Sequence, residues 1–158
     1  MNDSAEGQAV DMSFLLKDTE IESLRKGYNA EVMKAASKGG IAQVYPPGAP
    51  FPEGVVDWLY EGTPIAPRDR ERCLIALLAQ RQDGVMLAIH IYWGLMEGLG
   101  LDEIGRTLLL SGAYTGIPNY TAGLFTLKKT CAALKGVVAA GDAQSPTVLG
   151  GLLKEFNV

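Results

Sequence analysis

The chain of 158 residues has little of what metal clusters and disulfide frameworks need. It contains a single histidine and two cysteines, Cys73 and Cys131, which lie far apart in the sequence. Neither cysteine belongs to a CxxC pair or to a cluster with zinc-ligand spacing. The sequence therefore argues against a structural zinc site, and a domain of this size does not need a disulfide. We expect both thiols to be reduced.

Long apolar runs and an excess of positive charge are also missing. The sequence contains no run of about eighteen apolar residues, which is the length that a membrane-spanning helix needs. The start, "MNDSAEGQAVDMS", has neither the basic nor the apolar region of a secretory signal. The net charge is −4, whereas a general binder of phosphate backbones would need a basic face. We therefore expect a cytoplasmic protein that binds neither membranes nor nucleic acids.

What the chain does contain is helical patterning. Hydrophobic residues make up 47% and charged residues 20%, as is typical of globular proteins. No segment alternates with period two for long enough to predict a sheet, so we predict an all-α fold of helical hairpins. The expected helices lie within 14–37, ending at Gly39-Gly40, and over 67–81, 85–100, 101–114 and 115–138.

We expect these helices to form a single domain. Residues 1–13 read as a disordered tail, and residues 14–54 as N-terminal helices followed by a proline-rich connector. Residues 55–138 read as the helical core and 139–158 as a C-terminal tail. Because the connector would hold the N-terminal helices away from their own core, we expect them to cover a neighbouring subunit or the pocket.

The one histidine, His90, lies in "MLAIHIYWG", inside a helix that is apolar nearly all round and is therefore expected to be buried. A carboxylate beside a buried imidazole makes a pair that can transfer protons. Glu97 shares a helix face with His90. Glu71 lies in the first turn of the preceding helix, which the "QDG" break should fold back antiparallel.

Each of these residues also has a purely structural interpretation. A lone histidine in an apolar helix is often a core residue bonded to the backbone, and Glu71 in a charged first turn is often a solvated acid. Trp93 and Trp58 could equally pack in a core or an interface. Periodicity alone therefore does not predict an enzyme.

Several short motifs occur in register between residues 70 and 118. Arg70 and Glu71 open an aliphatic helix, His90 follows Glu71 by nineteen residues, and Gly98 follows His90 by eight. "DEI" then starts the next helix at Asp102, and "YTGIP" forms the turn after it. In this pattern, and in the lead-in "DWLYEGTPIAPRDR", residues 55–130 resemble the carboxymuconolactone decarboxylase family, which includes the AhpD-like proteins.

This resemblance implies an all-α, AhpD-like fold assembled as homo-oligomers, trimers or hexamers, with a pocket near the glutamate and histidine. For the decarboxylase branch it implies a lyase of aromatic-compound degradation, which releases CO₂ from a small lactone acid without metal or organic cofactor. His90 would then deliver the proton and Glu71 would orient it. The substrate-binding candidates are Arg70, Arg72, Tyr114 and Trp93, with Arg68 as a further arginine.

The chain departs from the peroxidase branch of this family. That branch places a CxxC seven and four residues before the histidine, where this chain has Asp83 and Met86. Neither side chain can form a thiolate, so a thiol peroxidase is disfavoured. An isomerisation on a related small acid, or a non-catalytic oligomeric binding protein on the same fold, remain alternatives.

Overall fold

The structure is a computed structural model that describes residues 12–44 and 64–158, and these residues form seven helices and no strand. The all-α class predicted from the sequence is confirmed. The helices are α1 (Asp18–Gly27), α2 (Ala30–Val44), α4 (Pro67–Arg81), α5 (Gly84–Met96), α6 (Leu101–Thr115), α7 (Ile117–Ala139) and α8 (Ser145–Glu155). Of the helices in this part of the chain, none combines the length and apolar character needed to cross a membrane.

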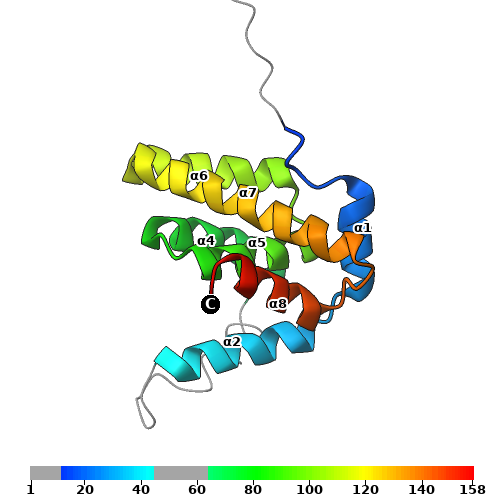
Figure 1. Cartoon of the computed structure of the whole chain (residues 1–158). Coiled ribbons are helices and arrows are strands. Elements are labelled where there is room, and N and C mark those ends of the chain that lie inside the picture. The colour runs from blue at the N-terminus through cyan, green and yellow to red at the C-terminus, as the bar shows by residue number, and fades with distance from the viewer. Residues whose placement is uncertain (1–11, 45–63) are drawn as a thin grey trace, which may run out of the picture.

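The α4–α5 hairpin lies at the centre of the molecule, between the α6–α7 pair and α2 (Figure 1). Its connection is the predicted "QDG" break. Gln82 adopts a left-handed conformation (φ 55°) that ends α4. Asp83 then accepts a hydrogen bond from the backbone N–H of Met86 (3.1 Å) and caps α5. The reversal is therefore tight, and it sets the two helices side by side.

The core runs through all the helices. Its fully buried apolar side chains include Leu24, Ile75, Ile91, Leu95, Ile104, Leu108, Leu134 and Val148. Helices α6 and α7 lie so close together that a Cβ at Gly112 would collide with the side chain of Tyr120. Helix α5 is the most deeply buried element, as its apolar character predicted: eight of its residues, Leu87 to Leu95 without Ile89, are buried.

The predicted end of one helix is wrong, and one helix was not predicted. Helix α2 continues through Gly39-Gly40 to Val44, so the glycine pair does not end it. The predicted C-terminal tail contains α8, whose Val148 and Leu152 are buried in the core. The N-terminal residues 1–11, the proline-rich connector and Trp58 lie outside the described residues.

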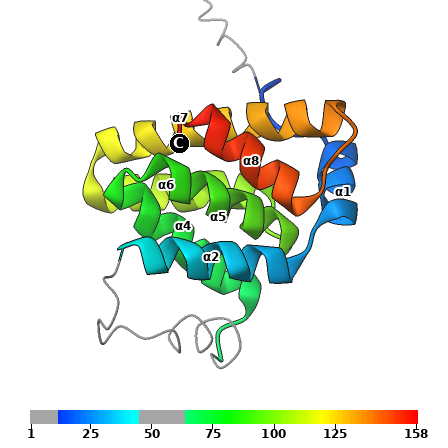
Figure 2. The ribbon, with the colours of Figure 1, turned by 60° about the horizontal axis from the view of Figure 1, so that its bottom comes forward.

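The N-terminal helices pack on the core of their own chain. Helix α1 contacts α5 and α7, and α2 contacts α8, as Figure 2 shows from below. Leu24 of α1 and Met33 of α2 are buried. The turn between them rests on the start of α8, where the backbone N–H of Asn29 donates to the Ser145 hydroxyl (2.8 Å). The expectation that the connector holds these helices away from their own core is therefore wrong.

Candidate active site

Glu71 and His90 meet in the interior of the α4–α5 hairpin. Oε2 of Glu71 lies 2.7 Å from Nδ1 of His90. The exposed fraction is 0% for Glu71 and 5% for His90. Antiparallel packing brings the first turns of α4 beside the middle of α5, so residues nineteen positions apart become neighbours.

The second oxygen of the same carboxylate is held by Arg70. Its Nε–H donates to Oε1 of Glu71 at 3.1 Å, and Arg70 is itself only 5% exposed. A buried carboxylate is costly unless it is paired and hydrogen-bonded. Here Arg70 supplies the positive charge and His90 the second hydrogen bond. Glu71 is thus compensated on both oxygens.

This arrangement favours one tautomer of the imidazole. A carboxylate paired with a guanidinium acts as an acceptor, so we assign the proton between Glu71 and His90 to Nδ1. Among the side-chain hydrogen bonds of the described residues, the one made by the His90 ring is at Nδ1. Nε2 is therefore the ring nitrogen that Glu71 does not engage.

The indole of Trp93 lies against this pair. Its ring is stacked on the His90 imidazole, with centroids 5.8 Å apart and planes inclined by 14°. The guanidinium of Arg70 lies over the same indole, with Cζ 5.7 Å from the ring centroid. Trp93 is buried. Of the predicted substrate-binding residues, Arg70 and Trp93 are thus brought to the pair.

Glu97, at the end of α5, holds the far edge of this indole. Nε1–H of Trp93 donates to Oε1 of Glu97 at 3.2 Å, and the hydroxyl of Tyr28 donates to the same oxygen at 2.9 Å. Burial, with the hydrogen bond to Glu97, raises the pKa of Tyr28 well above its ordinary value of 10. Tyr28 is therefore a hydroxyl donor at neutral pH.

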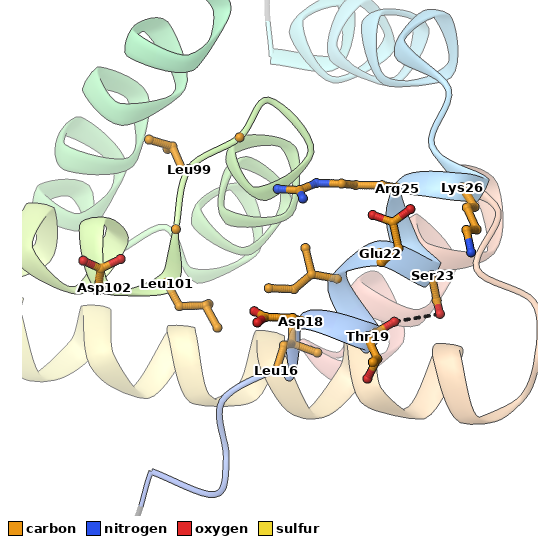
Figure 3. A pocket seen from close by; sticks show the side chains of 13 residues that line it. Leu16, Asp18, Thr19, Glu22, Ser23, Arg25, Lys26, Leu99, Leu101 and Asp102 are labelled. Carbon is orange, nitrogen blue, oxygen red and sulfur yellow. Dashed lines mark hydrogen bonds between the residues drawn. The ribbon is translucent and has the colours of Figure 1, made fainter.

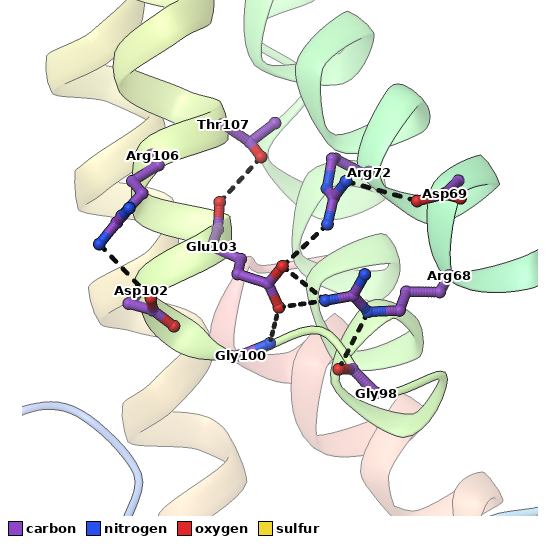
Figure 4. Close-up of polar contacts among 9 residues, drawn as sticks. All are labelled: Arg68, Asp69, Arg72, Gly98, Gly100, Asp102, Glu103, Arg106 and Thr107. Carbon is purple, nitrogen blue, oxygen red and sulfur yellow. Dashed lines mark hydrogen bonds and ion pairs between the residues drawn. The ribbon is translucent and has the colours of Figure 1, made fainter.

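Arg72 and Arg68 are held away from the pair by Glu103 of α6. Arg68 donates to both oxygens of Glu103 at 2.5 and 2.6 Å, and Arg72 donates to one of them at 2.8 Å (Figure 4). Arg72 also contacts Asp69. A backbone hydrogen bond from Gly100, and then the hydrogen bond from Arg68, lower the pKa of Glu103 below 4.5. These arginines bridge α4 to α6.

Tyr114 is also placed away from the pair. It is 86% exposed near the end of α6. The α6–α7 turn meets the C-terminal end of α4, where Gln82 donates to Asn119 (2.8 Å). That end lies roughly 15 Å along α4 from Glu71. The structure therefore does not bring Tyr114, a predicted substrate-binding residue, to the Glu71–His90 pair.

An open groove of about 840 Å³ lies elsewhere, between α1 and the α5–α6 loop (Figure 3). Arg25, Glu22 and Asp18 line it from α1, residues 98–100 line it from the loop, and Leu101 and Asp102 line it from the start of α6. Neither Glu71 nor His90 belongs to its walls. Figure 3 shows Arg25 extending toward the loop, where it donates to the carbonyl oxygen of Leu95 (3.3 Å).

The two thiols are separate and differ in environment. Cys73 is exposed on α4, whereas Cys131 is buried in α7. Burial raises the pKa of the Cys131 thiol to about 11, so it stays protonated at neutral pH. Across residues 12–44 and 64–158, no three His, Cys, Asp or Glu side chains gather into a potential metal site.

Sequence reasoning missed one member of the site and misplaced another. Glu97 was considered as a partner of His90, but it binds Trp93, four residues before it in the same helix. That i,i+4 spacing is a signal visible in the sequence. Tyr28 carries no such signal, because 69 positions separate it from Glu97.

Comparison of the chain with protein-family models, curated proteins and solved structures finds no match.

Proposed function

We propose that this protein is a cofactor-independent enzyme of the carboxymuconolactone decarboxylase family. Its reaction is a decarboxylation or isomerisation of a small carboxylated lactone or related acid, driven by Glu71 and His90. The observation that carries the proposal is the 2.7 Å contact between Oε2 of Glu71 and Nδ1 of His90 in the interior. The motifs in register over residues 70–118 and the all-helical fold support it.

In the decarboxylation, the electron pair of the breaking C–CO₂ bond moves into the conjugated carbonyl of the substrate. The resulting dienolate then takes a proton on carbon. The His90 imidazolium gives that proton from Nε2, and Glu71 stabilises the imidazolium through Nδ1. An isomerisation would use the same two residues, with neutral His90 first removing a proton and then returning it to another carbon.

Arg70 and Trp93 complete the proposed machinery. Arg70 neutralises the Glu71 carboxylate, to which it donates at 3.1 Å. Trp93 forms an apolar wall beside the imidazole. Arg72 and Tyr114 have no place in this proposal, because Glu103 engages Arg72 and Tyr114 lies at the other end of α4.

We further propose that the active form is a homo-oligomer, a trimer or hexamer. Large apolar side chains are exposed along α6 and α7, and neighbouring apolar side chains on a surface often mark a subunit contact. They are Leu109, Leu110, Tyr114, Ile117 and Phe125. The substrate is a small-molecule acid, and its loss of CO₂ requires neither a metal nor an organic cofactor.

The test is turnover of a panel of small carboxylated lactones and their isomers, followed by CO₂ release and by ultraviolet absorbance. His90→Gln and Glu71→Gln should each lower kcat/KM by about 10² to 10⁴-fold, the range that general acid–base catalysis supplies. EDTA should leave the wild-type rate unchanged.

Glu103→Gln is the matched control for this experiment. It neutralises a carboxylate on the neighbouring helix that binds two arginines but does not touch the pair. It should keep wild-type turnover. Circular dichroism checks that each variant is folded. Full activity in both folded His90→Gln and Glu71→Gln would rule out the acid–base role.

One observation favours a second candidate, a non-catalytic oligomeric binding protein. Arg70 and His90 engage both oxygens of Glu71, and all three side chains are almost entirely buried, as in a purely structural cluster. In that case no member of the lactone panel is turned over by the wild type, and the effect of Glu71→Gln is confined to a lower thermal midpoint. Turnover that depends on His90 excludes this candidate.

A further inference from the structure

Trp93 is fixed at two places that do not include Glu71. Its indole face contacts the His90 imidazole, and its Nε1–H is bound by Glu97. Oε1 of Glu97 accepts from both Trp93 and the Tyr28 hydroxyl. A continuous series of contacts therefore leads from Tyr28 through Glu97 and Trp93 to His90.

The imidazole needs such support. Its bond to Glu71 fixes Nδ1, but a single hydrogen bond does not by itself set the tilt of the ring about the line joining the two residues. Tilting moves Nε2, the atom that delivers the proton. A stacked indole resists that tilt, because aromatic rings at this separation prefer defined relative orientations. The position of Nε2 therefore depends on how firmly the indole is held.

Tyr28 is itself well placed to hold Glu97. Its ring meets the ring of Tyr92 edge-on, with centroids 6.3 Å apart and planes at 79°. The turn that carries it is fixed to α8 through the bond from Asn29 to Ser145. Tyr28 thus reaches Glu97 from a part of the chain that lies outside the motifs of the decarboxylase family.

We propose that Tyr28 and Glu97 are positioning residues, which hold Trp93 against His90 and thereby aim Nε2 at the substrate. This inference rests on the proposed function for its kinetic consequence. Its structural part, the control of the His90 ring by Tyr28, stands independently of any turnover.

The experiment uses the single histidine of the full-length chain. In NMR spectra of protein with isotope-labelled histidine, the ring protons of His90 give the only imidazole signals. The ring current of the Trp93 indole changes their chemical shifts. Trp93→Leu gives the reference spectrum without that shift. Tyr28→Phe and Glu97→Ala should both move the signals toward the Trp93→Leu values. Glu97→Gln should stay closer to wild type, because its amide oxygen still accepts hydrogen bonds.

The matched control is Tyr92→Phe. It removes one hydroxyl from a buried tyrosine of α5, which pairs with Ser145 at 3.3 Å, and keeps the ring that meets Tyr28. It should leave the His90 signals and turnover as in the wild type. In Tyr28→Phe, kcat should fall about fivefold, the factor for one ordinary hydrogen bond, while KM stays unchanged.

Two results would overturn the proposal: His90 signals in Tyr28→Phe that coincide with the wild type, or shifted signals with an unchanged kcat. If Glu97→Ala does not fold, Tyr28→Phe decides alone, since it loses only a hydroxyl. A fully active His90→Gln would instead refute the proposed function, and the spectra would still show whether Tyr28 holds the ring.

Discussion

At the scale of single residues, the buried ion pair of Arg70 and Glu71 governs what substitutions can do. Glu71 has no exposed surface and Arg70 almost none. Removing one partner of a buried pair leaves the other charge uncompensated, at a cost of about 3–5 kcal/mol. Glutamine at position 71 keeps the shape and one of the two acceptor oxygens but removes the charge that pairs with Arg70, so it disturbs the packing less than alanine does and its fold must still be checked.

The two thiols supply a prediction at this scale. Cys73 is exposed, and the buried Cys131 thiol has a pKa of about 11. At neutral pH, a thiol reagent should therefore modify Cys73 quickly in the folded protein and Cys131 only after unfolding. Absorbance of the released thiolate, followed with and without denaturant, measures this.

Cys73→Ser is the control for the thiol measurement. The folded variant should lose the fast phase altogether and should still release one equivalent in denaturant. A fast phase that survives in folded Cys73→Ser would show that Cys131 is accessible.

Part of the site was predictable from residue spacing. The break between two antiparallel helices predicted that Glu71 could reach His90, as it does, but left Glu97 open as a second candidate; the nineteen-residue interval carried weight only through the family resemblance. The roles of the arginines were not predictable. Arg68, Arg70 and Arg72 occupy one helical turn, and only packing decides that Arg70 faces inward while the others reach Glu103.

At the scale of elements, the same limit applies to the helices. Those over 67–81, 101–114 and 115–138 were predicted close to their observed bounds, because their apolar residues recur at helical spacing. Helix α8 was missed, since Pro146 and Gly150-Gly151 suggest a loop. Proline is tolerated in a first turn, and burial of Val148 and Leu152 outweighs the glycine propensity.

The bridge from α4 to α6 leads to a pH prediction. The lowered pKa of Glu103 means that its carboxylate stabilises the fold above pH 4.5, and that this stabilisation is lost as the pH falls through the lowered value. The thermal midpoint of Glu103→Gln should therefore lie below that of the wild type at neutral pH, and the difference should vanish in acid.

Asp102→Asn serves as the comparison for this pH prediction. Its carboxylate lies on the same helix and contacts only Arg106, at 3.9 Å on an exposed surface. Its thermal midpoint should follow the wild type at every pH. If the thermal midpoints of Glu103→Gln and the wild type, plotted against pH, ran parallel down to low pH, the assigned role of Glu103 would be contradicted.

At the scale of the whole molecule, the end of α1 packs tightly against the segment just before α8. A Cβ at Gly27 would collide with the backbone carbonyl of Ala143. Gly27→Ala should therefore lower the free energy of unfolding by about 1–3 kcal/mol, as overpacking does. Urea denaturation followed by circular dichroism gives this value.

Gly136→Ala is the matched control within α7. A Cβ there has no neighbour within 4 Å. The substitution should raise the free energy of unfolding by up to about 1 kcal/mol, because alanine favours a helix. Equal effects of the two substitutions would mean that Gly27 marks no tight contact.

The contact between the α1–α2 turn and α8 has a consequence for synthesis. Proteins emerge from the ribosome N-terminus first, so α1 appears long before the segment at Ala143 and Ser145 that anchors it. Until that segment is translated, Tyr28 lacks its anchor, and the nascent polypeptide carries Glu71 and His90 without the full set of supports. Maturation of the centre is thereby coupled to the last helix described.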